Sequence, residues 1–193
     1  MRYPKSHKAE TKLRIVETAA RLFRKKGYDG IGIDSLMEEA GLTRGGFYSY
    51  FRSKRELLVA VMTHRHDFIE RLRARTGTNR RKLAAQARQI AQDYVASENN
   101  KAVLGGCSLA ALANDCSRAD KSAQRHYAKA VRALAEELSE GLKDRQTLDA
   151  RALQAVALCV GALLIQNAAA ADTELTVGVS EAAKSLLAEL LGD

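Results

Sequence analysis

Residues 33–54 read IDSLMEEAGLTRGGFYSYFRSK, and this stretch decides the fold. Apolar residues recur at helical spacing before Gly41, and a second short helical pattern follows Thr43. Glycine readily adopts the left-handed conformation that a sharp turn between helices needs, and Leu42 can fill the corner between them. The stretch therefore predicts a helix-turn-helix, a motif that points to DNA.

The second helix of this motif begins with residues suited to contact with a nucleic acid. Thr43 is placed to cap the helix, and Arg44 can reach a guanine edge or a phosphate. Gly45 and Gly46 cost roughly 1 kcal/mol each relative to alanine inside a helix and somewhat less at an end. A close backbone approach, or phosphate binding at the helix N-terminus, would offset that cost. Tyr48 offers a hydroxyl to a phosphate oxygen.

A second anion-binding point is expected at the next helix start. Ser53 and Glu56 have the spacing of a capping box, which places Lys54 at the helix N-terminus. For the box taken alone, an ordinary capped helix is the alternative. Apolar residues at helical spacing continue this helix to about Arg75. The helix would connect the DNA-binding domain to the C-terminal domain.

Composition and charge favour a helical protein with a basic N-terminal part. The 193 residues are 46% hydrophobic, include one proline and few aromatic residues, and carry a net charge of +8. Residues 1–80 hold 18 Lys/Arg against 9 Asp/Glu (+9), and the remainder holds 13 against 14. This asymmetry predicts a polyanion-binding head on a neutral body. A membrane surface is the competing partner, but the first residues lack the apolar core of a signal peptide, so we expect a cytoplasmic protein without membrane contact.

At this point the run from Ile33 to Leu58 resembles the N-terminal signature of the TetR/AcrR transcriptional regulators. The helix expected at about 8–26 fits the same pattern, whereas Gly32 stands where the family usually has Ser or Thr. The resemblance implies a homodimer that binds a palindromic operator, normally as a repressor, and that a small-molecule effector releases. It also implies base or phosphate contacts by Thr43, Arg44, Gly45, Gly46, Tyr48 and Lys54.

We therefore expect an all-α protein of about nine helices in two domains. An N-terminal three-helix helix-turn-helix DNA-binding domain would occupy residues 1–58, with the following helix bridging to about 75. Residues 76–193 would form a helical domain for effector binding and dimerisation. Its helices are expected at about 81–96, 109–116, 120–143, 149–171 and 173–191.

The effector pocket should combine apolar helix faces with scattered polar groups. We expect its lining to include His64, Arg65, Tyr94, Cys107, Tyr127 and Gln166. An ion pair is the alternative for Arg65, because an arginine on an apolar stripe needs a partner. Cys107 follows two glycines near a helix start, where a thiol pKa is lowered, so a redox or electrophile sensor is conceivable; a small packed hydrophobe is the alternative.

The last two helices are too apolar for a water-exposed surface. We expect them to form a four-helix dimer interface with the same pair from a second chain, and burial within one monomer is the rival interpretation. The interface would include Leu153, Val156, Val160, Leu164, Ala183, Leu186, Leu187 and Leu190.

Other functional classes receive little support from the sequence. It contains no Ser/His/Asp arrangement, metal motif, phosphate loop or paired catalytic carboxylates, so we expect no enzyme and no cofactor. The three cysteines lack metal-ligand spacing. A nucleoid-type protein that binds DNA without an effector remains an alternative.

Overall fold

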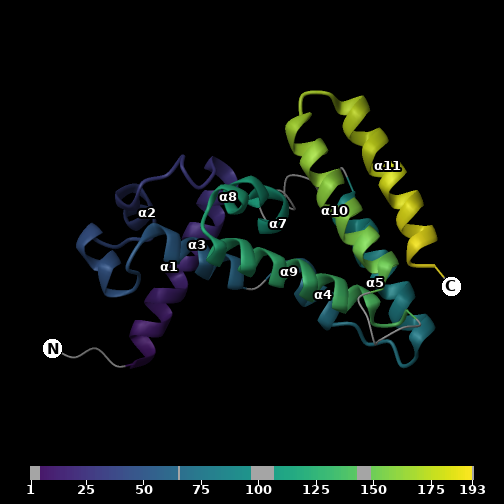
Figure 1. Ribbon diagram of the computed structural model, residues 1–193, viewed down its shortest axis with the longest axis horizontal. Helices are drawn as coiled ribbons and strands as arrows, with labels where there is room; N and C mark the ends of the chain where they lie inside the picture. Colours follow the sequence, from purple (N-terminus) through teal and green to yellow (C-terminus); the bar gives the residue numbers. More distant parts are fainter. Residues whose placement is uncertain (1–4, 65, 97–106, 143–148, 193) are drawn as a thin grey trace. The chain divides into compact units, whose positions relative to one another are not determined.

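The computed structural model describes residues 5–64, 66–96, 107–142 and 149–192. Within these ranges the chain forms ten α-helices and one 3-10 helix and no strand, so the all-α prediction is confirmed (Figure 1). The count exceeds nine because two expected helices are each divided in two.

The chain separates into two compact units, which we call the head and the body. The head consists of residues 1–64 and 111–127, and the body consists of residues 65–110 and 128–193. The boundary expected at residue 76 therefore lies inside the body, and residues 111–127 join the head although we expected them in the C-terminal domain. Long-range contacts explain this, because the Tyr28 amide donates to Asp115 Oδ2 (3.4 Å) and Arg55 pairs with Asp120 (3.7 Å).

The head begins with two helices that lead into the predicted turn. Helix α1, Lys5–Lys26, ends in three basic residues followed by Gly27, which has φ +75°. Helix α2, Ile33–Glu39, starts after Gly32 and is followed by Gly41, which has φ +67°. Gly41 thus supplies the left-handed residue that the sequence predicts at the turn. The side chains of Phe23, Leu36 and Met37 are fully buried beneath these helices.

The second helix of the motif is a short 3-10 helix, η1, Arg44–Ser49, and not the expected α-helix. Thr43 occupies the N-cap position, but its side chain accepts no capping bond; instead the Gly46 amide donates to the Thr43 carbonyl (3.0 Å). Two glycines in the first turn weaken the α-helical preference, which favours the tighter form. Phe47 is fully buried and anchors η1 to the core.

The prediction of one continuous helix from Ser53 to about Arg75 is wrong, because the structure has two helices there. The capping box does form, because Ser53 Oγ accepts the Glu56 amide (3.1 Å), but α3 spans Lys54–Thr63 and α4 spans Asp67–Arg73. The Thr63 hydroxyl donates back to two carbonyls of its own helix, and Asp67 suits the positive N-terminus of a new one. The division falls where the head ends in the sequence.

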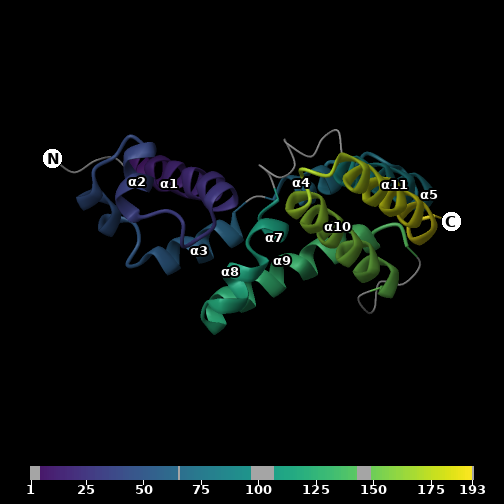
Figure 2. The same cartoon turned by 90° about the horizontal axis from the view of Figure 1, so that it is seen from above.

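Long antiparallel helices make up most of the body. Helix α5 (Arg80–Val95) packs against α11 (Thr173–Leu190) and α10 (Ala150–Ala168), and α10 lies beside α11 in both views (Figures 1 and 2). Helix α7, Ser108–Ala111, belongs to the body except for its last residue, whereas α8, Ala113–Arg118, belongs to the head. The division between the units falls inside α9, Lys121–Ser139.

Helix α10 is long and apolar enough, by length and composition, to cross a membrane. One side of it is nevertheless buried against α5 and α11, and Gln166 in that side donates to the Val95 carbonyl (3.1 Å). These contacts are those of a core helix. The buried residues of α10 are Ala152, Ala155, Val156, Cys159, Ala162, Leu163 and Gln166.

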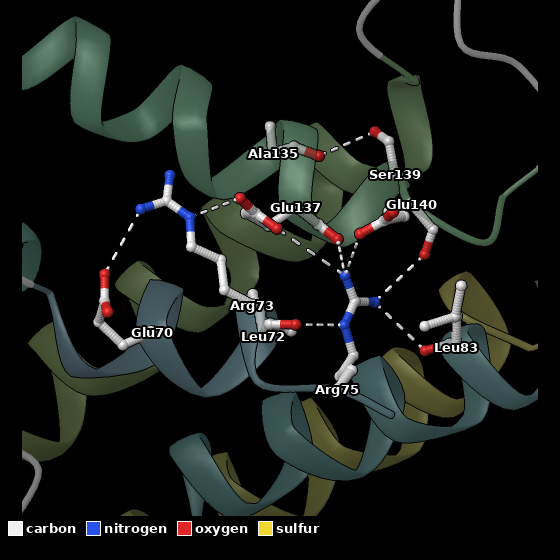
Figure 3. A network of polar contacts seen from close by, with 9 residues as sticks. All are labelled: Glu70, Leu72, Arg73, Arg75, Leu83, Ala135, Glu137, Ser139 and Glu140. Carbon is white, nitrogen blue, oxygen red and sulfur yellow. Dashed lines mark hydrogen bonds and ion pairs between the residues drawn. The ribbon is translucent and has the colours of Figure 1, made fainter. Parts of the chain in front are cut away.

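A buried arginine joins three elements of the body (Figure 3). The side chain of Arg75 is 1% exposed, and its guanidinium donates to the carbonyls of Leu72 (2.5 Å), Leu83 (3.2 Å), Glu137 (2.7 Å) and Glu140 (3.2 Å). Glu140 also accepts with its carboxylate (3.3 Å). Burial lowers the pKa of Arg75, while Glu140 and Glu137 oppose that shift. The guanidinium therefore binds carbonyls at or just beyond the C-terminal ends of α4 and α9 and one carbonyl of α5.

Candidate functional site

The 3-10 helix η1 carries predicted DNA-binding residues on its exposed side and buries Phe47 on the other. The side chain of Arg44 is 71% exposed and Tyr48 is 60% exposed. Thr43 and Gly45 are also exposed, while Gly46 is half-buried near Thr43 Oγ1 (3.7 Å) and Met37 Cε (3.8 Å). Four of the six predicted DNA-binding residues thus lie on η1, and a fifth, Thr43, is its N-cap.

Two arginines of the head form ion pairs with carboxylates of α2. Arg44 Nη1 lies 2.9 Å from Asp34 Oδ2, and Arg21 Nη2 of α1 lies 2.6 Å from Glu39 Oε1. The hydrogen bond from Arg21 lowers the pKa of the Glu39 carboxyl. The sequence pattern did not predict the pairing of Asp34 with Arg44.

Lys54 is placed differently from the other predicted DNA contacts. Its ammonium donates to the Tyr28 carbonyl and lies 4.3 Å from the centre of the Tyr28 ring and 5.8 Å from that of Phe23. Burial lowers the pKa of Lys54, while Asp29 and Asp115 oppose that shift. Because an ammonium has three N–H donors, the Tyr28 bond leaves donors that can reach a phosphate.

Tyr28 connects Lys54 to a segment distant in the sequence. Its amide donates to Asp115 of α8, whose side chain is also paired with Arg118 (3.1 Å). Burial raises the pKa of the Tyr28 hydroxyl. Sequence reasoning missed Tyr28 and Asp115, because no local pattern signals a contact across 87 residues.

Taken together, these features define a class of protein. A left-handed glycine joins two short helices over a buried aromatic and aliphatic core, and the exposed side carries an arginine, a tyrosine and bare backbone. Such surfaces bind phosphates and base edges. The head is a helix-turn-helix DNA-binding domain.

Comparison with known proteins relates the N-terminal segment to a family of regulators. Residues 15–61 match the model described as bacterial regulatory proteins, tetR family. An HTH-type transcriptional regulator of Bacillus subtilis, YuxN, is 38% identical over 53 residues, which are 28% of this chain and 18% of the relative. The Escherichia coli repressor NemR is 26% identical over 147 residues, 72% of each chain. Residues 15–61 are therefore similar to the DNA-binding segment of tetR-family transcriptional regulators.

Solved structures share the fold over most of the chain. The reduced form of Escherichia coli NemR matches with a TM-score of 0.71 at 21% identity, covering 93% of this chain and 96% of that one. FadR of Bacillus subtilis, solved in complex with stearoyl-CoA, matches with a TM-score of 0.62 at 16% identity, covering 91% and 96%. The first curated relatives matched in sequence are covered over only 18% to 32% of their own length.

The residues expected in an effector pocket fall into both compact units. His64 lies at the end of α3 with Nε2 4.0 Å from a Glu17 carboxylate oxygen, and Tyr127 is half-buried in α9; both belong to the head. Arg65 lies outside the described residues. The other three, Tyr94, Cys107 and Gln166, belong to the body.

Within the body, these three residues lie in the core. Tyr94 is buried and stacks on Phe68 with ring centres 3.9 Å apart, and burial together with Cys107 raises its pKa well above the ordinary value. Cys107 is 6% exposed, and its sulfur accepts the Ala110 amide (3.2 Å). Burial also raises the pKa of Cys159. A polarisable, mostly apolar cluster thus forms around Tyr94.

The packing of α10 and α11 within one protomer buries some residues of the predicted dimer interface and leaves others exposed. Leu153, Leu164 and Leu186 are exposed, and Val160 and Leu190 are half-buried. The rival interpretation, burial within the monomer, holds for the remaining three, because one side of each helix packs against its neighbours. These are Val156, Ala183 and Leu187.

Proposed function

We propose that this protein is a homodimeric repressor that binds a palindromic operator through η1 and leaves it when a small-molecule effector binds the body. The observation that carries the proposal is the exposure of Arg44 and Tyr48 on a 3-10 helix whose Phe47 is fully buried. An exposed arginine and tyrosine on a fixed backbone suit a major groove. Their neighbours, Gly45 and Gly46, allow the backbone to approach the DNA closely.

Release follows from the geometry of two half-sites. The two recognition elements of a dimer must lie about 34 Å apart, or a multiple of that distance, to enter successive major grooves. An effector that favours another separation weakens DNA binding by its differential affinity for the two states. A molecule with equal affinity for both states would have no effect.

The core cluster of the body suggests the chemistry of the effector. Tyr94, Cys107 and Gln166 add a few polar groups to an apolar interior, which suits a modest organic molecule. The structural neighbour FadR is described with stearoyl-CoA, a largely apolar ligand. We propose an apolar organic effector and a cytoplasmic location, where such a molecule and the operator meet.

The proposal is tested by selecting duplexes from a random pool with the full chain and titrating variants on the best site and on random DNA. Tyr48→Phe should weaken both kinds of complex about fivefold, because it removes one hydrogen bond to a phosphate. Arg44→Ala should weaken both and also change the preferred bases. The proposal would be contradicted if both variants bound DNA as the wild-type protein does, or if the wild-type protein enriched no sequence.

A second candidate is a redox or electrophile sensor acting through Cys107. The Cys107 sulfur accepts the Ala110 amide near a helix start, whereas 6% exposure limits access to the thiol. Alkylation at neutral pH separates these effects. If Cys107 reacts no faster than free cysteine, or Cys107→Ser leaves release from DNA intact, the sensor role is excluded.

The third candidate is a nucleoid-type protein that binds DNA without an effector. Its binding would depend on salt but show little preference for sequence. The selection experiment separates it from a repressor, because only sequence-specific binding enriches a common site.

A further inference from the structure

We propose that Asp34 is a positioning residue that holds the Arg44 guanidinium toward one base of the operator and so contributes to sequence specificity. The proposal rests on the DNA binding through η1 proposed above. Asp34 makes no base contact in this role and acts through Arg44.

The two side chains meet across the turn of the motif. Arg44 is the first residue of η1 and Asp34 is the second residue of α2, and Arg44 Nη1 lies 2.9 Å from Asp34 Oδ2. Both side chains are largely exposed, at 71% and 59%. The ion pair therefore lies on the solvent side of the turn, where DNA can reach it.

The backbone on both sides of this pair is fixed by the core. The Leu42 amide donates to the Met37 carbonyl (2.8 Å) across the turn, and Gly41 takes its left-handed conformation there. Met37 on α2 and Phe47 on η1 are fully buried. The core thus fixes the distance between the backbone segments that bear Asp34 and Arg44. Because that distance is fixed, the ion pair holds the guanidinium in one orientation.

The chemistry of arginine allows one guanidinium to serve both partners. It has five N–H donors in a planar fork, and the pair with Asp34 joins one nitrogen to one oxygen. A guanine presents two acceptors, O6 and N7, that take two parallel donors. An arginine already held by a carboxylate loses less rotamer freedom on meeting that base.

The carboxylate also disfavours non-specific binding. Without Asp34, Arg44 would be free to turn toward a phosphate, an interaction that is the same for every sequence. A negative charge beside the guanidinium repels phosphates and makes that alternative less favourable. Asp34 should therefore lower the affinity for random DNA more than the affinity for the operator.

The head supplies a matched control on the same helix. Glu39 of α2 pairs with Arg21 of α1 (2.6 Å) and is likewise exposed, but it does not contact Arg44 in the described structure. Glu39→Gln and Asp34→Asn each remove one negative charge. Long-range attraction to DNA changes alike in both, so a difference between them reports on Arg44.

The experiment uses the full chain and duplexes that the wild-type protein selects from a random pool. Each variant is titrated on the best selected site, on versions with one base pair changed, and on random DNA. Asp34→Asn should lower the ratio of selected-site to random-DNA affinity by about two- to fivefold. Asp34→Asn should lose base preference at the same base pair of the selected site at which Arg44→Ala loses it. Glu39→Gln should strengthen all complexes and leave that ratio unchanged.

Two further variants separate positioning from altered folding. In the Arg44→Ala background, Asp34→Asn should not change the ratio further, because its effect passes through the guanidinium. Asp34→Glu retains the charge and the favourable helix-terminus interaction, and it should recover part of the preference.

The proposal is overturned if Asp34→Asn and Glu39→Gln give the same ratio, or if Asp34→Asn lowers the ratio equally without Arg44. In either case sequence-specific binding by the wild-type protein would stand. If the wild-type protein enriches no sequence, the proposed function fails and the role of Asp34 fails with it.

Discussion

At the scale of single residues, Lys54 makes contacts that stabilise the head, and we propose that it also contacts a phosphate of DNA. Its ammonium binds the Tyr28 carbonyl and lies over the Tyr28 ring, yet it stands at the N-terminus of α3, where phosphates are attracted. The remaining donors of the ammonium make the two roles compatible. In that proposed role, the bond to the Tyr28 carbonyl would orient the lysine before DNA binds.

We expect Lys54→Met to affect DNA binding and stability separately. Loss of the charge should weaken complexes with all sequences and reduce the salt dependence of binding by about one phosphate contact per protomer. Loss of the contacts with Tyr28 should destabilise the head by about 1 kcal/mol. Titrations at several salt concentrations and thermal unfolding measure the two effects.

Tyr48→Phe is the matched control for this experiment. It removes an uncharged hydroxyl, so it should leave the salt dependence unchanged. An unchanged salt dependence in Lys54→Met as well would exclude a phosphate contact by Lys54.

Much of the head was predictable at this scale because its signals are local. Gly41 at the turn and Ser53 at a helix start each follow from a few neighbouring residues, and the structure confirms them. The pairing of Arg44 with Asp34 was not predicted, since an ion pair between exposed side chains leaves no periodic pattern. The six DNA contacts remain predictions of what these residues do.

At the scale of elements, the body depends on how its helices end. Arg75 follows α4 and binds carbonyls near the ends of α4 and α9 and one within α5 (Figure 3). The sequence pattern predicts Arg75 only as the end of a long helix and considers an ion pair for Arg65. Arg75 was missed because its partners come from residues up to 65 positions away.

Arg75→Met should destabilise the body strongly. It removes a buried guanidinium that donates to four carbonyls, and breaking such a buried charged network costs about 3 to 5 kcal/mol. Denaturant unfolding followed by circular dichroism should register this loss. Lysine in place of arginine should restore little, because it lacks the planar fork that reaches several carbonyls at once.

Arg73→Met is the control for this change. Arg73 is half-exposed and pairs with Glu137 (2.7 Å) and Glu70 (3.4 Å), so it shares a partner with Arg75. As an exposed ion pair it should contribute less than about 1 kcal/mol. Equal losses in the two variants would contradict the role assigned to the buried guanidinium.

At the scale of the whole molecule, α10 and α11 retain an apolar side after the monomer has folded. Leu164 and Leu186 are exposed, although their helices pack against each other and against α5. The sequence indicated helices too apolar for a surface but could not divide their residues between core and interface. That division depends on which side of each helix meets α5.

We expect the double variant Leu164→Glu/Leu186→Glu to be monomeric. Two carboxylates per protomer in an apolar interface would remain unpaired and desolvated. Sedimentation velocity over a concentration series should show the change from dimer to monomer, and binding to a selected palindromic site should weaken with it.

Val177→Glu is the matched control, because Val177 is also exposed on α11 but lies nine residues from Leu186, on the opposite side of the helix. It should leave the dimer intact. A dimer that survives the double variant would place the interface elsewhere.

The inclusion of residues 111–127 in the head has a consequence for how the chain is made. The contact between Tyr28 and Asp115 cannot form until α8 has left the ribosome, although the helix-turn-helix itself emerges much earlier. Closing a loop of 87 residues is also slow relative to forming local helices. During synthesis, the nascent helix-turn-helix therefore exists for a period without its contact with α8.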